Sequence, residues 1–378
     1  MRTEQNAQMT NSAPPAPTAT PPERLQRLRG LHPGWFAAVM GTAILAVATY
    51  DNPCDIATLE SVAHAAGVVI AVITYALAIV LIVAYVARWI RHSDAAIADL
   101  RHPVMGALYG TVPGGLLVLA VMTSVIGPAV LSDSAVTAIV AALAVVGGVL
   151  ALAISVTFAY VLFTGEAPVA MVNGGWFIPP VVTIIIPMAL VPLMPHVSSG
   201  TSRQLLMLGY ALYGMGFLLF LFVMSLLHDR LVLHPLPGAP MAPSLWIGLG
   251  PVGVGVLALL ALAHAGAPVF GSSASTVTLI SQLAATGLWG FGIWWLAAAI
   301  ALLVRYLRTG TLPYSLGWWA FTFPLGAFTV ATLTLARLWD TSLIEWFAVL
   351  LYAGLVIFWV VVSAGTIRGL RSGLVWRR

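Results

Sequence analysis

The sequence is 378 residues long, with 60% hydrophobic and only 7% charged residues, and its mean hydropathy is +1.00. A water-soluble domain carries charge on about a quarter of its residues, so this composition excludes a soluble globular protein and requires lipid around most of the surface. All 16 basic residues are Arg, scattered along the chain rather than clustered, which argues against a nucleic-acid partner. The one cysteine, Cys54, excludes an internal disulfide bond and argues against a cysteine-based metal site.

The distribution of polar residues divides the chain into three parts. Residues 1–31 are rich in Pro, Ala, Thr and Asn, show no hydrophobic periodicity and lack the apolar core of a signal peptide. We expect a disordered tail there, retained in the mature protein. Residues 32–367 should form one membrane domain, because no polar block within them is large enough for another, and residues 368–378 a short basic tail.

The membrane domain contains ten apolar segments that approach or exceed the roughly 20 residues a helix needs to cross a bilayer. In chain order we place them at residues 33–50, 62–87, 103–131, 135–163, 176–194, 204–227, 244–266, 276–306, 316–338 and 343–367. The fourth and eighth are long enough to tilt or to extend past the lipid. The expected fold is an all-α integral membrane protein with ten transmembrane helices.

The positions of the arginines test the number of segments. With ten segments, 14 of the 16 Arg residues fall on the side that holds both chain ends, and only Arg203 and Arg337 fall on the other. The 12 acidic residues divide equally. Cytoplasmic loops are enriched in basic residues, so this bias predicts cytoplasmic N- and C-termini and a location in the cell membrane.

Proline and glycine interrupt the odd-numbered segments, whereas the even-numbered segments have no interior proline. A proline inside a helix removes a backbone hydrogen bond and kinks the chain, and the freed groups are costly against lipid but tolerable beside protein or water. We therefore expect five quasi-repeated hairpins, with kinked odd helices inside around a central pore; ordinary tolerance of Pro and Gly in membrane helices is the alternative. The candidate pore-lining residues are Gly41, Thr42, Pro113, Pro179, Pro187, Gly250, Pro251 and Pro324.

Charged residues are missing near the centre of every segment. A buried charge there costs about 2.5–3.5 kcal/mol and usually marks an ion-pair or proton-relay site. A neutral pore with basic flanks would admit anions more readily than cations and select them weakly, by size and dehydration. Glu166 is interpreted as a solvated interfacial acid, with a place at a pore mouth as the alternative, and His228 and His234 flank a loop without further metal ligands. We expect no enzyme, no metal and no cofactor.

Aromatic residues open most of the odd segments and are typical of membrane-interface anchors: Trp35-Phe36, Trp176-Phe177, Trp246 and Trp318-Trp319. Phe321 and Phe323 differ, because they approach the interruption at Pro324, where a phenyl ring would narrow a pore and make both residues pore-lining candidates. A lone phenylalanine in a membrane helix normally packs. The residues alone therefore leave both packing and gating open.

In their order along the chain, these motifs resemble the tellurite-resistance/dicarboxylate transporter family, which includes malate permeases, sulfite efflux pumps and slow-type, voltage-dependent anion channels. The resemblance extends from about residue 32 to 367 and rests on Trp35-Phe36 with Met40-Gly41-Thr42, His102-Pro103 with Pro113, Trp176 to Pro180, Gly250 to Gly253, and Trp318 to Pro324. It implies five quasi-symmetric hairpins and a homotrimer with one pore per subunit. It also implies a gate at the phenylalanine before the ninth-segment proline, which is Phe323 here.

The residues and the resemblance together predict transport of small anions through the lipid bilayer. C4-dicarboxylates such as malate are the first expectation, and sulfite, tellurite-type anions, chloride and nitrate are alternatives. An alternative of another class is a membrane anchor subunit of a respiratory oxidoreductase, which would need haem or quinone ligands inside the bilayer. The sequence leaves open the direction of transport and the choice between a channel and a proton-coupled carrier.

Overall fold

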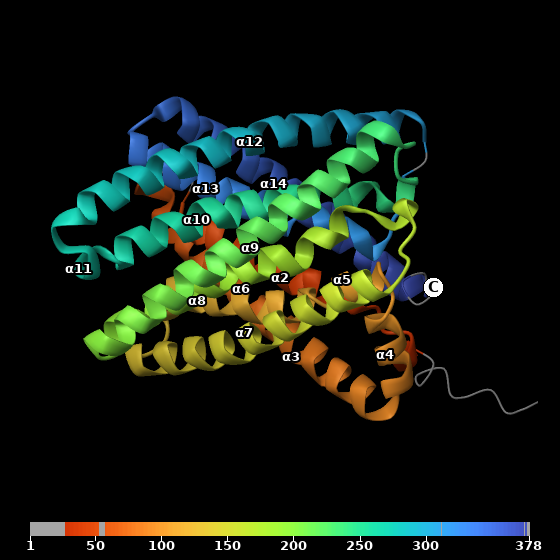
Figure 1. Cartoon of the computed structure of the whole chain (residues 1–378), viewed down its shortest axis with the longest axis horizontal. Helices are drawn as coiled ribbons and strands as arrows, with labels where there is room; N and C mark the ends of the chain where they lie inside the picture. Colours follow the sequence, from red (N-terminus) through yellow and green to blue (C-terminus); the bar gives the residue numbers. More distant parts are fainter. Residues whose placement is uncertain (1–26, 53–56, 311, 374, 376–378) are drawn as a thin grey trace, which may run out of the picture.

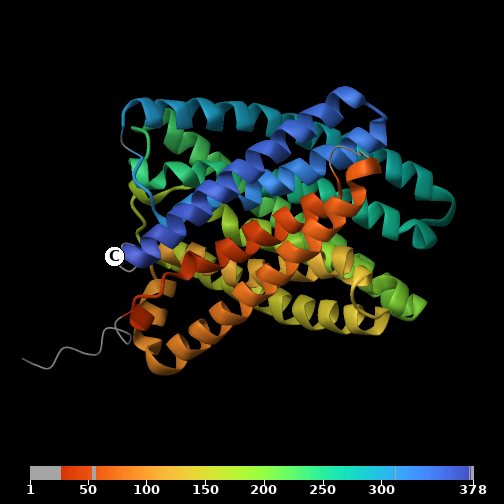
Figure 2. The same cartoon turned by 180° about the vertical axis from the view of Figure 1, so that it is seen from behind.

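The computed structural model describes residues 27–52, 57–310, 312–373 and 375. Most of the expected N-terminal tail and Cys54 therefore lie outside the described residues. Within them, ten helical spans are long and apolar enough to cross a membrane, as predicted. Figures 1 and 2, taken from opposite sides, show spans running along one common direction, with the first described residues and the C-terminus at the same end, called here the terminal end.

Each even-numbered span contains one long α-helix, and these five helices form the outer surface of the bundle. Between 22 and 33% of the most apolar window of each of these spans is buried. At 31 to 35 residues they are longer than the bilayer requires, and Arg residues stand in the last turns of most of them, where a cation is favourable at the helix C-terminus. These outer helices are α3 (Glu60–Arg91), α7 (Asp133–Thr164), α9 (Ser199–Leu233), α12 (Ala274–Arg308) and α14 (Ser342–Ser372). The last of them extends five residues into the segment 368–378 that we expected to be a tail.

The odd-numbered spans are broken and buried, with 67 to 89% of the corresponding window buried. Each contains one longer α-helix, and these inner helices are α2 (Phe36–Tyr50), α6 (Thr111–Ile126), α8 (Ile178–Leu190), α10 (Leu249–Ala265) and α13 (Phe323–Trp339). Four of them follow a 3-10 segment at the terminal end: η1 (Pro33–Trp35), η5 (Gly174–Phe177), η7 (Ala239–Gly248) and η9 (Leu316–Phe321). The third span begins instead with α5 (Met105–Leu108), and the Nδ1 atom of His102, just before it, accepts from the backbone N–H groups of Val104 and Met105.

The structure corrects our interpretation of the prolines as mid-helix kinks. Pro113, Pro179, Pro251 and Pro324 lie in the first turn of their α-helices, directly after the break, and only Pro187 lies inside an inner helix. A proline in the first turn loses no helical hydrogen bond, and its fixed φ angle favours the start of the helix. These prolines therefore mark where the 3-10 or turn segment ends and the α-helix begins.

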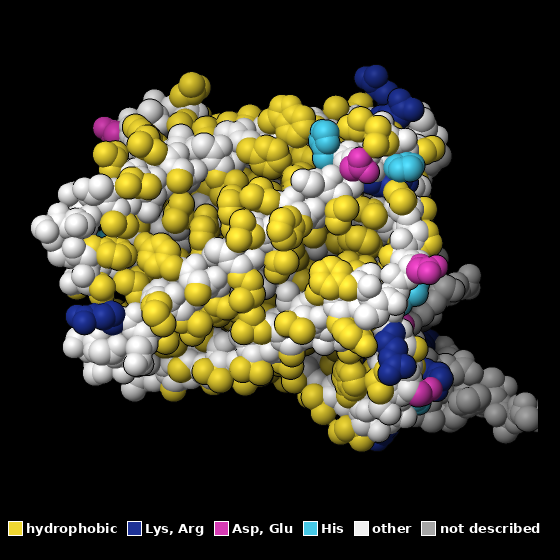
Figure 3. Space-filling view, in the orientation of Figure 1, with side chains coloured by type: hydrophobic (Ala, Val, Ile, Leu, Met, Phe, Trp, Pro, Cys, Tyr) yellow, Lys and Arg dark blue, Asp and Glu magenta, His cyan; other side chains and the backbone are white. Residues whose placement is uncertain are grey.

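The inner helices form a closed ring in chain order. Each packs against the next, α2 on α6, α6 on α8, α8 on α10 and α10 on α13, and α13 closes the ring against α2. Each outer helix packs against the inner helix that precedes it, which gives five hairpins around one axis. Figure 3 shows hydrophobic side chains over the middle of the bundle and most of the visible Arg side chains at the terminal end.

Short segments join the spans. They are η2 (Ala57–Leu59), α4 (Ser93–Leu100), η3 (Gly127–Ala129), η4 (Val169–Met171), η6 (Val191–His196), α11 (Ala267–Phe270) and η8 (Gly271–Ser273).

Arg88 is buried, although the sequence places it in a loop after the second segment. Its side chain is fully buried near the end of α3. The guanidinium donates to Oδ2 of Asp99 in α4 at 2.6 Å, to the hydroxyl of Tyr109 at 2.8 Å and to the carbonyl oxygen of Arg29 at 3.2 Å. This cluster fixes the N-terminal segment and α4 against the start of the third span.

Candidate functional site

A cavity of about 450 Å³ opens at the terminal end, on the axis of the inner ring. All five odd-numbered spans contribute to its walls, and Val375 near the C-terminus lines it as well. Each odd-numbered span contributes one residue near the start of its inner α-helix: Ala37, Thr111, Ile178, Ile247 and Ala320. We call this cavity the vestibule. A larger groove of about 670 Å³, which includes His228, lies between α9 and α12 on the outer surface and is lined only by those two helices.

Polar side chains at the vestibule hold the starts of the odd spans. His32 Nδ1 accepts from the backbone N–H of Gly34 at 3.0 Å, and Asn173 Oδ1 accepts from that of Gly175 at 2.7 Å. Ser244 Oγ accepts from the backbone N–H of Gly174 at 3.1 Å. Each side chain satisfies a donor that the start of a helix leaves open. These three polar residues therefore serve the local fold.

The described residues that line the vestibule are mostly apolar or small. No Arg lines it among the described residues, and its only imidazole is that of His32. The inner helices all start at this end, so the positive ends of their dipoles point toward the vestibule, and Arg residues stand in the last turns of four of the outer helices.

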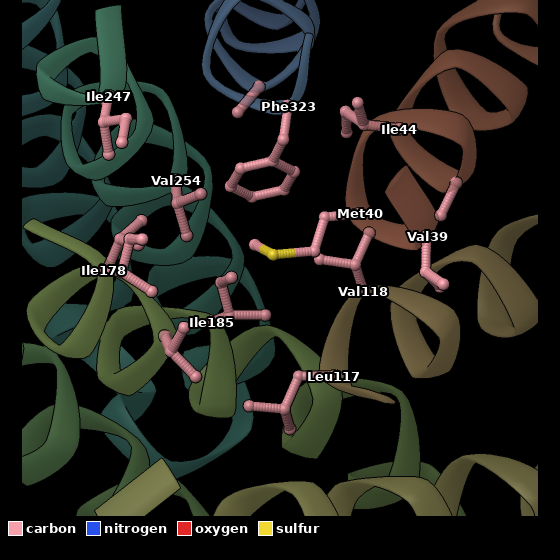
Figure 4. Packing of buried hydrophobic residues seen from close by; sticks show 14 of the residues in the cluster. Val39, Met40, Ile44, Leu117, Val118, Ile178, Ile185, Ile247, Val254 and Phe323 are labelled. Atoms are coloured by element: carbon pink, nitrogen blue, oxygen red, sulfur yellow. The ribbon is translucent and has the colours of Figure 1, made fainter. Parts of the chain in front are cut away.

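Below the vestibule the axis is filled by side chains around Phe323. The Phe323 side chain is 6% exposed and projects into the centre of the ring, where Met40 and Val254 also lie (Figure 4). An ideal Cβ built on Gly250 would lie 3.9 Å from Phe323 Cε1 and 3.8 Å from Pro324 Cβ, so Gly250 also borders this central space. The vestibule therefore ends above a closed section.

Two of the other predicted pore-lining residues contact the outer helix α14. Phe321 packs between Trp246 and Phe358, with ring centroids 5.3 and 5.0 Å away. Thr42 Oγ1 accepts from the indole N–H of Trp359 at 3.1 Å, so both Phe321 and Thr42 contact α14 rather than facing the axis, and the structure corrects these two predictions.

Two further predicted positions lie at contacts between helices. An ideal Cβ on Gly41 would lie 2.0 Å from Thr322 Oγ1, so Gly41 sits where α2 and the start of α13 nearly touch. Pro187 lies against Gly209 of α9, on the outward side of α8. Pro113, Pro179 and Pro251 are buried in the first turns described above.

Sequence reasoning missed Met40, Gly114 and Val181, which lie at the depth of Phe323. The repeated pattern of the odd-numbered spans could have identified these residues. Counting five residues from the aromatic residue near the start of each odd span gives Met40, Gly114, Val181, Pro251 and Phe323, starting from Trp35, Tyr109, Trp176, Trp246 and Trp318. Contacts at this depth join all five inner helices, because ideal Cβ atoms on Gly41, Gly114 and Gly250 meet residues of the neighbouring inner helices.

Comparison with known proteins places the chain among membrane transport proteins. Residues 30–367 match the family model described as voltage-dependent anion channel. An uncharacterized transporter of Methanocaldococcus jannaschii is 33% identical over 356 residues, covering 94% of this chain and 97% of the relative. A sulfite efflux pump of Trichophyton rubrum is 24% identical over 349 residues, covering 90% and 91%. A malic acid transport protein of Schizosaccharomyces pombe is 22% identical over 165 residues, covering 42% and 38%.

Proposed function

Because the chain belongs to the voltage-dependent anion channel family, we propose that small anions cross the membrane along the axis of its inner helices and that Phe323 gates this path. The observation that carries the proposal is the vestibule, whose walls come from all five odd-numbered spans and which leads to the closed section around Phe323. An anion would enter the weakly positive mouth, lose part of its hydration shell between apolar walls, and pass when the phenyl ring rotates aside.

We consider two classes of substrate. The first is C4-dicarboxylates such as malate, which the similarity to a malic acid transport protein supports. Sulfite is the second, because the similarity to a sulfite efflux pump extends over 90% of the chain. Chloride and nitrate complete the set that a flux experiment has to compare.

The proposal includes a location and an assembly. We place the protein in the cell membrane with both termini in the cytoplasm, on the strength of the 14 to 2 distribution of Arg residues. We propose a homotrimer with one path per subunit, as the family resemblance implies. Cysteine accessibility at Arg308→Cys and Arg203→Cys in a Cys54→Ala background tests the orientation, since the two sites should react from opposite sides.

Flux into liposomes tests the path and the substrate together. Purified protein is reconstituted, and uptake of malate, succinate, sulfite, chloride and nitrate is measured with and without a pH gradient. We expect flux of at least one of these anions above protein-free liposomes. A visible absorbance spectrum of the same sample tests the anchor-subunit alternative, and haem bands would support that alternative.

Phe323→Ala tests the gate, and Phe328→Ala is a matched control. Both residues are buried phenylalanines of α13, but the Phe328 ring lies against Gly292 of the outer helix α12. Truncating a buried phenylalanine costs about 3–5 kcal/mol of stability at either position, so the two variants bear similar destabilisation. Of the two variants, we expect only Phe323→Ala to raise anion flux. Equal flux in folded Phe323→Ala and wild-type protein would contradict the gate.

A further inference from the structure

The depth of Phe323 holds a second long side chain, Met40 of α2. An ideal Cβ on Gly41 would lie 2.0 Å from Thr322 Oγ1, so the backbones that carry Met40 and Phe323 meet at this depth. Both side chains are nearly fully buried, at 4 and 6% exposure. Figure 4 shows them projecting into the same central space from adjacent inner helices.

Each of these two side chains lies against a glycine of its other neighbouring helix. An ideal Cβ on Gly114 of α6 would lie 2.9 Å from Met40 Sδ and 3.0 Å from Met40 Cε. One on Gly250 of α10 would lie 3.9 Å from Phe323 Cε1. The end of Met40 therefore occupies room that a side chain at position 114 would take, and the ring of Phe323 borders Gly250 of α10.

We propose that Met40 is a second occluding residue, so that the closed path is a plug of two side chains, of which Met40 lies closely against Gly114. This inference rests on the proposed axial path and adds a residue to it. Methionine has a flexible, unbranched side chain that adapts to irregular space. When Phe323 alone is truncated, the Met40 side chain can swing into the vacated volume and keep the path partly blocked. Full opening requires both side chains to leave the axis.

A double-mutant comparison tests the plug. Anion flux is measured in liposomes for wild type, Met40→Ala, Phe323→Ala and the double variant. Met122→Ala is the control, because Met122 is a fully buried methionine of α6 that lies eight residues beyond Gly114. Residues in direct contact couple by about twofold or more. We therefore expect the double variant to exceed Phe323→Ala by at least about twofold, and Met122→Ala to add nothing in the Phe323→Ala background.

The outcomes separate this inference from the proposed function. If no variant and no wild-type sample carries anions, the axial path itself is wrong. If Phe323→Ala carries a raised flux that Met40→Ala leaves unchanged, only the inference about Met40 is overturned.

Gly114→Ala gives an independent test, since the added methyl would displace the flexible end of Met40 from its resting place. We expect it to lower the flux of Phe323→Ala and to leave the flux of the Phe323→Ala/Met40→Ala variant unchanged. Equal inhibition in both backgrounds would show that Gly114 acts other than through Met40 and would count against the plug.

Discussion

Asp99→Asn should destabilise the protein more than removal of the whole Arg88–Asp99 pair. The Arg88 side chain is fully buried and the Asp99 side chain is 12% exposed, with Nη2 and Oδ2 2.6 Å apart. Asp99→Asn keeps the size of the side chain but leaves a buried guanidinium without its counter-charge. Arg88→Met in the same chain removes that cation while an apolar side chain of similar length fills its place.

The burial of the Arg88–Asp99 pair sets the size of the expected loss in the free energy of unfolding. Removing one partner of a buried ion pair costs about 3–5 kcal/mol, because the remaining charge stays buried and uncompensated, whereas replacing both by apolar or neutral groups is often nearly neutral. The Tyr109 hydroxyl still donates to the carbonyl oxygen of Ala96 at 3.1 Å in the double variant, so it keeps a partner. We expect Asp99→Asn to lower the free energy of unfolding by about 3–5 kcal/mol. The double variant Arg88→Met/Asp99→Asn should lower it clearly less.

Unfolding in mixed detergent micelles by rising dodecyl sulfate, followed by tryptophan fluorescence, measures both variants against wild type. The exposed pair Arg337–Asp51 is the control: its atoms are 2.7 Å apart, but its side chains are 42 and 31% exposed. Asp51→Asn should cost no more than about 1 kcal/mol. The reasoning is refuted if Asp99→Asn costs no more than Asp51→Asn, or if the double variant is less stable than Asp99→Asn.

Two further predictions concern stability. Gly253→Ala should lower the thermal unfolding midpoint in detergent, because its Cβ would lie 2.5 Å from the carbonyl carbon of Ala327. Gly287→Ala is the control: nothing lies within 4 Å of its Cβ, so the better helix propensity of alanine should raise the midpoint slightly. Similar midpoints for both would contradict the close approach. The backbone N–H of Ala95, helped by Arg29, lowers the pKa of exposed Asp94, so its small stabilisation is present above about pH 3.9 and disappears as the pH falls through the lowered pKa. Asp94→Asn should therefore lower the stability slightly at pH 7 and remove the loss of stability that occurs in wild type as Asp94 is protonated. An unchanged dependence of stability on pH would contradict this prediction.

The ten spans were predictable because a membrane span carries its signal locally, in about 20 consecutive apolar residues. The division into inner and outer spans was predictable as well, from the confinement of proline to the odd segments. The mechanism that we attached to the prolines was wrong: Pro251 and Pro324 start α-helices rather than bending them. Proline within an apolar run does not reveal whether the residues before it continue an α-helix or form a 3-10 segment, because both fit the same hydrophobic pattern.

The burial of Arg88 was not predictable for a different reason. A single Arg near the end of a long apolar segment has the same local appearance whether it faces water or a carboxylate, and its partners Asp99 and Tyr109 lie 11 and 21 residues away. The packing of α4 against α3 decides between the two. Phe323 was identified as a gate only through the family resemblance, and nothing in the local sequence of Met40 sets it apart from a packing residue.

Neighbouring positions of the inner helices should differ in how well they tolerate a change of side chain. Gly41, Gly253 and Gly326 lie where inner helices nearly touch, with ideal Cβ atoms 2.0, 2.5 and 2.5 Å from atoms of the facing helix, so a side chain at any of them must push two helices apart or displace a branched side chain. Met40 and Phe323, by contrast, place flexible ends in the central space. Changes at these two positions can alter the width of the path while the helix contacts that hold the ring stay intact.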